Sequence, residues 1–411
     1  MLIRNITPKI VEALADTPVV MLNGARQTGK STLAKSLIGA KQIEHYVTLD
    51  DATALAAAKH DPTGFISGLG EATVIDEIQR APELFVAIKA DVDRNRTPGR
   101  YLLTGSANVL LLPRLSESLA GRMEIFTLWP LSQGEFAGVR EMFIDMLFSE
   151  KLPSSEPISA DTKTTLIERA VRGGYPEAAA RSSESRRRAW FSSYVTTILQ
   201  RDVRDIANID GLTAMPRLLA MIATRSPSLL NYSEFSRTTG LPQSTLKRYM
   251  TLFETIFMID LLPAWYSNLG KRLVKTAKLV MNDTGLLSTL LAVDAARLEN
   301  TPLCGAVIEN FVIMELRKQI SWSDTRPAML HYRTQTGREV DVVLEDMAGR
   351  VVGIEIKSAK SVGGQDFSGL KSLAEASGNN FLRGIVLYSG SEMVSFGSNL
   401  FAMPIDSLWA T

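Results

Sequence analysis

The residues with the clearest chemistry form a glycine-rich loop near the amino terminus. The run GARQTGKS over residues 24–31 matches the pattern G-x-x-x-x-G-K-[ST] and directly follows the apolar run VVMLN. Two glycines let the backbone curl so that successive N–H groups point inward, where they bind phosphate oxygens. The pattern therefore predicts a phosphate-binding loop, with an ordinary glycine-rich turn as the alternative. Its predicted nucleotide contacts are Gly24, Ala25, Arg26, Gln27, Thr28, Gly29, Lys30, Ser31 and Thr32.

Two residues of this loop have the most specific predicted roles. Lys30 would contact the β and γ phosphates of ATP, and the Ser31 hydroxyl would bind Mg²⁺. An acidic pair, Asp76 and Glu77, follows the apolar run of ATVIDEIQ. Asp76 would support Mg²⁺, and Glu77 would act as the general base that polarises the attacking water. Such a pair also occurs at the ends of ordinary strands, but the nearby loop favours the catalytic interpretation.

Hydroxyl and guanidinium groups complete the predicted ATP site. Thr104 and Ser106 end the strand YLLTGSA, where they would lie between the acidic pair and the γ phosphate, unless they only cap the strand. Arg122 ends the helix RLSESLAGR and would stabilise transition-state charge on a neighbouring subunit's γ phosphate. A cation favoured by the helix dipole is an equally weighted alternative. Arg114 is a second candidate for the same role.

The elements that must position these residues alternate along the first third of the chain. Short apolar runs at VVMLN, YVTLD, ATVIDEI, RYLLTGSA and EIFTLWPL are separated by helical patterns. Buried strands that alternate with helices predict an α/β fold with a parallel five-stranded sheet. After Pro130 the pattern becomes mainly helical.

Several segments resemble one known family. NGARQTGKSTL, YVTLDD, VIDEIQRAP, LLTGSAN and LAGRMEIFTLWPLSQGEF, in this order, resemble prokaryotic AAA+-type ATPases that carry a C-terminal domain of unknown function. RGGYPEA, YVTTILQRDVRDI and LVMNDTGLLSTLL are similar to the same family, so the resemblance covers nearly the whole chain. It implies a P-loop NTPase core, a helical lid, a winged helix and a C-terminal α/β nuclease-like domain. We place these parts at residues 1–138, 139–205, 206–295 and 296–411.

A helix-turn-helix pattern lies in the third of these parts. SEFSRTTG reads as a short helix with Ser233 as N-cap and Gly240 past its end, and PQSTLKRYMTLFETI reads as a recognition-type helix. The strands MIDLLPAW and AKLVMND, with GKRLVKTAK between them, would form a basic wing. Winged helices also contact proteins, which is the alternative to DNA binding. The predicted DNA contacts are Gln243, Ser244, Lys247 and Arg248 on the helix and Lys271, Arg272 and Lys275 on the wing, which also carries Lys278.

The last part contains the spacing of a PD-(D/E)xK nuclease. Glu309 lies in a predicted helix, Asp341 in the strand EVDVVLED, and Glu355 and Lys357 on one face of the strand VVGIEIKSA. Asp341 and Glu355 would bind Mg²⁺ or Mn²⁺, Glu309 would complete the metal shell, and Lys357 would assist the nucleophile. The alternatives are charges on a solvated hairpin, or a nuclease-like fold retained as a binding module.

Composition limits the class of protein. The chain has 411 residues, a net charge of +1, 45% hydrophobic and 22% charged residues, which is typical of a globular protein with several domains. Cys304 is the single cysteine, and His45, His60 and His331 form no recognisable metal-ligand spacing. Acidic residues interrupt the apolar stretches of the amino terminus, and runs such as IFMIDLLPAW are short, so we expect neither a signal peptide nor a membrane span. A cytoplasmic location follows as an expectation.

Three functional hypotheses are consistent with these patterns. The leading one is an ATP-hydrolysing machine that binds and processes or senses DNA, with Mg-dependent cleavage in the C-terminal domain. It predicts a homo-oligomer, with a hexameric ring as one form. The second is a nucleotide-dependent switch that binds protein partners and whose nuclease-like fold is catalytically silent. The third is a transcriptional regulator with an ATP sensor that prefers one operator sequence.

Overall fold

The computed structural model describes residues 2–38, 43–108, 119–150, 152, 162–206, 214–272 and 275–410. Side chains 201–206, 269 and 271 are outside this description. The contacts divide the chain into two compact units. The first contains Ile3–Leu131 and Thr251–Phe257, and the second contains Ser132–Met250 and Met258–Thr411.

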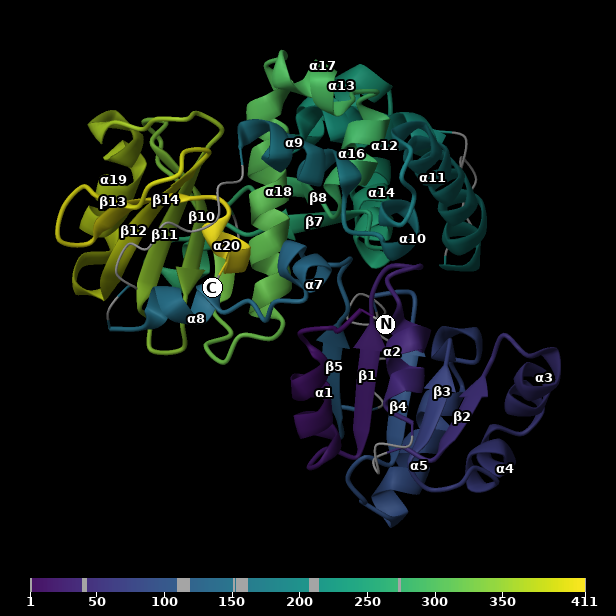
Figure 1. Cartoon of the computed structure of the whole chain (residues 1–411). Coiled ribbons are helices and arrows are strands. Elements are labelled where there is room, and N and C mark those ends of the chain that lie inside the picture. The colour runs from purple at the N-terminus through teal and green to yellow at the C-terminus, as the bar shows by residue number, and fades with distance from the viewer. Residues whose placement is uncertain are drawn as a thin grey trace. The chain divides into compact units, whose positions relative to one another are not determined.

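The first unit contains a five-stranded sheet in which every pair of neighbouring strands is parallel. The strand order is β2-β3-β4-β1-β5, which Figure 1 shows with β1 between β4 and β5. This sheet confirms the predicted α/β fold. The strands are β1 (Val19–Asn23), β2 (His45–Thr48), β3 (Thr73–Asp76), β4 (Tyr101–Gly105) and β5 (Met123–Thr127).

Apolar side chains of these strands and of the surrounding helices form one core, in which Met21, Ile75 and Leu103 are fully buried. Because parallel strands place their carboxyl ends at one edge, the residues that follow β1, β3 and β4 meet there. The helices of this unit are α1 (Thr7–Leu14), α2 (Lys30–Ser36), α3 (Ala52–His60), α4 (Pro62–Ser67) and α5 (Leu84–Arg94), with a 3-10 turn, η1, at Ile78–Arg80.

The second unit begins with helices around a small antiparallel sheet of order β6-β8-β7. Its strands are β6 (Ser228–Leu229), β7 (Ile259–Leu262) and β8 (Lys278–Met281). The helices are α7 (Gln133–Ala137), α8 (Phe143–Phe148), α9 (Lys163–Arg172), α10 (Pro176–Ala179), α11 (Glu184–Ile206), α12 (Met215–Arg225), α13 (Tyr232–Thr239), α14 (Gln243–Thr255), α15 (Leu269–Arg272), α16 (Thr284–Leu290), α17 (Ala295–Glu299) and α18 (Leu303–Ile320).

The helix-turn-helix pattern has one local correction. The Asn231 side chain accepts a hydrogen bond from Glu234 N and caps α13, so the N-cap is Asn231 and not Ser233. The asparagine precedes the first helical residue and offers a carbonyl oxygen to the free N–H groups of the first turn. Gly240 ends α13 with φ of 73°, as the sequence predicts. The β7–β8 connection contains α15 rather than a plain hairpin.

A six-stranded sheet of order β13-β14-β12-β11-β10-β9 forms the last part of the second unit. Neighbours β9, β10 and β11 are antiparallel, whereas β11, β12 and β14 run parallel. Helices α18 and α19 (Ser368–Ser377) both pack on β11. The strands are β9 (Ala328–Arg333), β10 (Glu339–Glu345), β11 (Val351–Lys357), β12 (Phe381–Tyr388), β13 (Val394–Ser395) and β14 (Leu400–Pro404), with η4 (Gly364–Phe367), η5 (Gly378–Asn380) and α20 (Ser407–Ala410) beside them.

Among the described residues, no helix combines the length and the apolar character that crossing a membrane requires.

Candidate functional site

The glycine-rich loop has a backbone that only glycine can follow at its two defining positions. Gly24 and Gly29 have φ of 144° and 97°, in the region that side chains rarely adopt. A Cβ on Gly24 would lie 2.3 Å from Leu128 O. Gly29 is the N-cap of α2, so the loop leads directly into the positive end of that helix.

Lys30 lies inside the loop rather than in solvent. Its side chain is buried, and Nζ donates hydrogen bonds to Gly24 O at 2.9 Å and to Ala25 O at 2.7 Å. Arg4 supports the loop from outside, because its guanidinium donates to Thr28 O at 2.8 Å and to Trp129 O at 2.6 Å. The sequence gives no signal for the role of Arg4, which precedes α1 and belongs to no motif.

The Asp76 carboxylate accepts hydrogen bonds from several hydroxyl groups, including that of Ser31, the other predicted Mg²⁺ ligand of this site. Its Oδ1 accepts from Ser31 Oγ at 2.9 Å and from Thr104 Oγ1, and its Oδ2 accepts from Tyr46 OH at 2.7 Å. Burial and the hydrogen bond to Asp76 raise the pKa of Tyr46, so its hydroxyl remains a donor. A hydroxyl beside a buried carboxylate is a donor set that fits Mg²⁺ with its water shell. Sequence reasoning missed Tyr46.

Glu77 lies beside this group in a left-handed backbone conformation, with φ of 60°. Its N–H donates to Thr104 Oγ1 at 3.1 Å, and its carboxylate accepts from Gln79 Nε2 and from Ser106 Oγ, the latter at 3.4 Å. Gln79 Nε2 also donates to Ser106 Oγ at 2.9 Å. The structure therefore brings the predicted residues Glu77, Thr104 and Ser106 together and adds Gln79.

The other predicted nucleotide contacts are less closely gathered. Ala25 and Thr28 are buried in the loop, Arg26 is half-buried, and Gln27 and Thr32 are exposed. Gln27 lies in the loop, whereas Thr32 lies in the first turn of α2.

Arg122 lies at the amino-terminal end of the sheet strands, whereas the loop follows their carboxyl-terminal end. It directly precedes β5, whose first residue pairs in parallel register with Val19 at the start of β1. Its Nε donates to Asp93 Oδ1 at 2.5 Å, and Nη1 donates to Ala120 O at 3.0 Å. A five-residue strand separates the two edges by roughly 13 Å, so Arg122 does not belong to its own chain's loop. Arg114 lies outside the described residues.

A buried lysine organises the C-terminal carboxylates. Lys278 Nζ lies 2.7 Å from Glu309 Oε1 and 2.9 Å from Asp341 Oδ1, and Asp341 Oδ2 accepts from Ile356 N at 3.0 Å. Lys278 is 8% exposed. The prediction that it contributes charge to an exposed wing is therefore wrong, because β8 directs this side chain into the acidic group.

The pair Glu355 and Lys357 lies beside this cluster. Lys357 Nζ is 2.7 Å from Glu355 Oε1, whereas the buried Glu355 Oε2 has no hydrogen-bond partner in the described structure. Burial and the charge of Asp341 raise the pKa of Glu355 to about 7, and the same two causes raise that of Glu309 to about 8. The negative charge of Asp341 therefore opposes the ionisation of both Glu309 and Glu355 in a poorly solvated region.

The arrangement does not fit the predicted Mg²⁺ or Mn²⁺ site. Among the described residues, no group of three His, Cys, Asp or Glu side chains is placed to hold a metal ion. The Lys278 ammonium contacts both Glu309 and Asp341, so a positive charge already occupies the place between these two carboxylates.

The predicted DNA contacts fall into two groups. Gln243, Ser244, Lys247 and Arg248 are exposed on α14, as predicted for its outer face. Lys275 is exposed, but Arg272 Nη1 lies 2.6 Å from Glu345 Oε2, so an internal carboxylate neutralises Arg272. The side chain of Lys271 lies outside the described residues.

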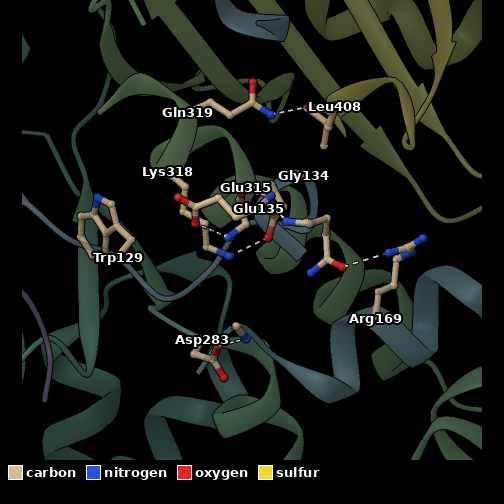
Figure 2. A network of polar contacts seen from close by, with 12 residues as sticks. Trp129, Gly134, Glu135, Arg169, Asp283, Glu315, Lys318, Gln319 and Leu408 are labelled. Atoms are coloured by element: carbon tan, nitrogen blue, oxygen red, sulfur yellow. Dashed lines mark hydrogen bonds and ion pairs between the residues drawn. The ribbon is translucent and has the colours of Figure 1, made fainter. Parts of the chain in front are cut away.

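A buried polar network at the start of the second unit has no counterpart in the predictions. Gln133 N donates to Glu315 Oε2 at 2.9 Å, and Lys318 Nζ donates to Glu315 Oε1 at 2.6 Å. Figure 2 shows Glu315 and Lys318 of α18 beside Gly134 and Glu135 of α7. Gly134 N donates to Glu141 Oε1 at 2.9 Å. The residues of this buried network come from distant parts of the sequence, so no local sequence pattern could indicate the network.

Comparisons with known proteins match three segments of the chain. A family model described as an AAA domain matches residues 16–137. A Domain of unknown function (DUF8612) matches residues 163–297, and a Domain of unknown function (DUF4143) matches residues 304–408. The uncharacterized proteins Rv2008c of Mycobacterium tuberculosis and Mb2031c of Mycobacterium bovis are each 33% identical to the chain, over 99% of this chain and 85% of the relative.

The chain belongs to a family of P-loop ATPases with a C-terminal DUF4143 domain. Among solved structures, it is similar to the Walker-type ATPase PABY2304 of Pyrococcus abyssi, with a TM-score of 0.44, 13% identity, and coverage of 71% of this chain and 96% of that chain. No functional conclusion follows from a similarity at that level.

The matched segments show which domains supply the buried ion cluster of Lys278, Glu309, Asp341 and Glu355. Lys278 lies within the DUF8612 match, whereas Glu309, Asp341 and Glu355 lie within the DUF4143 match. The cation and the carboxylates that it neutralises therefore come from two different domains of this P-loop ATPase.

Proposed function

We propose that the chain binds ATP with Mg²⁺ at the loop of residues 24–31 and hydrolyses it. The observation that carries this proposal is the convergence of Ser31 and Thr104 on Asp76, with Glu77 at the same edge of the sheet. Ser31 and Asp76 would hold Mg²⁺, which neutralises charge on the phosphates as the terminal P–O bond breaks. Lys30 supplies a second positive charge at the same place.

Glu77 would accept a proton from the attacking water. Gln79 and Ser106 hold its carboxylate, so these two side chains set the direction in which the base faces. Thr104 ties the backbone of Glu77 to Asp76, and this connection keeps the base at a fixed place relative to the metal-binding carboxylate. Proton transfer of this kind contributes roughly 10²–10⁴-fold to a rate.

The proposal is tested with Lys30→Ala and Glu77→Gln. The first change is expected to remove ATP binding and turnover, whereas the second should retain ATP binding and lower kcat by about 100-fold or more, because only proton transfer is lost. ATP affinity and phosphate release are measured separately. Lys59→Ala, an exposed lysine on α3, is the matched control. Unchanged turnover in Lys30→Ala would refute the proposal.

A second candidate function is DNA contact by α14. Gln243, Ser244, Lys247 and Arg248 project from the first turns of this helix, after the Gly240 turn, where a recognition helix presents its side chains. This exposed face supports an ATP-dependent switch that acts on DNA. The Lys278 ammonium among the C-terminal acids favours a DUF4143 domain that is catalytically silent, so we propose binding or assembly for it rather than strand cleavage.

An assembly of several copies is part of the same proposal. Arg122 lies at the sheet edge away from its own loop, so it could contact the γ phosphate only of ATP bound to another copy. A homo-oligomer, with a ring as one form, would bring the two together.

A further inference from the structure

A cavity of about 450 Å³ lies in the second unit, away from the ATP-binding loop in the sequence. Its walls come from α9, from the first turn of α11 and from the start of α17. This volume lies within the range of pockets that bind small molecules. The lining residues that bear on its chemistry are Thr165, Glu168, Arg169, Arg172, Glu184 and Arg187.

Two of the three arginines lack a carboxylate partner. Arg172 Nη2 donates to the neutral Gln133 Oε1 at 2.9 Å, and Arg187 Nη1 donates to Arg181 O at 2.8 Å. The Nε atoms of Arg172 and Arg187 are both buried and have no hydrogen-bond partner in the described structure. Each guanidinium is thus held by neutral oxygen atoms and keeps an unused donor.

The positive charges of two neighbouring arginines act on Arg172, and the negative charge of Glu315 opposes them only in part. Burial and the neighbouring positive charges of Arg169 and Arg187 lower the pKa of Arg172. The acidic lining does not remove this repulsion, because Glu184 pairs with Arg188 at 2.8 Å and Glu168 is exposed. An anion between the arginines would relieve this repulsion.

We propose that this cavity binds a compact phosphorylated small molecule. Arginine side chains present planar donor pairs that match phosphate oxygens, and Arg172 and Arg187 approach the cavity from two different helices. The first turn of the 23-residue helix α11 adds the positive end of a helix dipole. The lining side chains that the structure describes carry no aromatic ring, so the proposal is based on recognition of the phosphate group alone.

The test uses the full-length chain with Lys30→Ala, so that the ATP loop does not contribute phosphate binding. Pyrophosphate is titrated into this protein by calorimetry. We expect one saturable site whose affinity falls by about tenfold or more with Arg187→Ala and also with Arg172→Lys, since each change removes charge-assisted hydrogen bonds to the anion. Arg186→Ala, an exposed neighbour on α11, should leave the affinity within about twofold.

Parallel titrations with inorganic phosphate and ribose 5-phosphate distinguish a free anion from a phosphate ester. Tighter binding of one of these two ligands than of the other supports the site and shows whether its ligand is a free anion or an ester. Thermal unfolding of each variant shows that the fold is intact. If Arg172→Lys does not fold, Arg187→Gln decides the question. Absence of saturable pyrophosphate binding, equal affinity in the Arg187 variants, or an equal loss with Arg186→Ala would overturn the proposal. Competition by duplex DNA would also overturn it in favour of a polymer site.

Discussion

Lys278 and Asp341 form a buried ion pair, with 2.9 Å between Nζ and Oδ1, although they are 63 positions apart in the sequence. Glu309 bonds to the same ammonium at 2.7 Å. One lysine therefore contacts two acidic residues of the DUF4143 domain, the buried Asp341 and the half-buried Glu309. Because the carboxylates lie in a poorly solvated region, their charged forms are costly unless this single cation is present.

Replacing this lysine is expected to destabilise the protein strongly. Lys278→Met leaves the acids without a cation, and breaking a buried pair in this way costs about 3–5 kcal/mol of unfolding free energy. Urea denaturation measures the loss. Lys275→Ala, an exposed lysine just before β8, should change stability by less than about 0.5 kcal/mol. Equal midpoints for Lys278→Met and the natural chain would show that the pair contributes nothing.

The buried Glu141 predicts a specific pH dependence of stability. Burial and the charge of Glu315 raise its pKa from 4.5 to about 8 in the folded chain. The folded state therefore binds this proton more tightly, and the associated stability is present below about pH 4.5 and is lost as pH rises toward 8. One such proton changes the unfolding free energy by at most about 1.4 kcal/mol per pH unit.

Glu141→Gln isolates this effect, because the amide cannot ionise but retains the shape and an acceptor for Gly134 N. We expect the stability of the variant, relative to the natural chain, to increase between pH 5 and pH 8. Thermal unfolding across this range gives the difference, and the exposed Glu83→Gln is the control. A difference that does not vary with pH would contradict the raised pKa.

Arg122 predicts complementation between inactive chains. If it acts on ATP bound to another copy, Arg122→Ala should lower ATP turnover by about 10³-fold without weakening ATP binding. A mixture with Lys30→Ala should then recover activity, since some interfaces combine an intact loop with an intact arginine. Steady-state turnover of the mixture is the measurement, with Arg94→Ala as an exposed arginine control. Full activity of Arg122→Ala alone would show that Arg122 does not act in ATP hydrolysis and serves only in its ion pair with Asp93.

The exposed face of α14 predicts salt-dependent DNA binding. Arg248→Ala should weaken binding to a duplex oligonucleotide, and the dependence of log affinity on log salt concentration should decrease by about one if the arginine contacts a phosphate. Fluorescence anisotropy at several salt concentrations gives both values. Lys371→Ala, exposed on α19, is the matched control. Identical affinities for the natural chain and for a combined Lys247→Ala and Arg248→Ala variant would remove α14 from the interface.

The gathering of Ser31, Asp76 and Thr104 could be predicted from sequence because these residues belong to neighbouring βα units of one parallel sheet. Asp76 ends β3 and Thr104 lies near the end of β4, while Ser31 lies in the first turn of α2, after the loop that follows β1. Because these strands are parallel, the fold itself brings the three residues to one edge. The sequence shows where those strands end, and no knowledge of distant packing is needed.

Lys278 shows where this reasoning fails. The run AKLVMND predicts the strand β8 correctly, but its pattern does not show which buried group the lysine meets. Exposed lysines are far more common than buried ones, so the sequence favoured a basic wing. Arg4 and the arginines of α9 and α11 were missed for the same reason, because their partners are set by tertiary packing.

The residues of the buried ion cluster come from two domains, which has a practical consequence for fragments of this protein. A polypeptide that begins at the DUF4143 match keeps Glu309, Asp341 and Glu355 but omits the lysine that holds them. Its acids would take up protons or capture a divalent ion from the buffer. Metal binding or nicking by such a truncated piece would then arise from the excision and would not describe the intact chain.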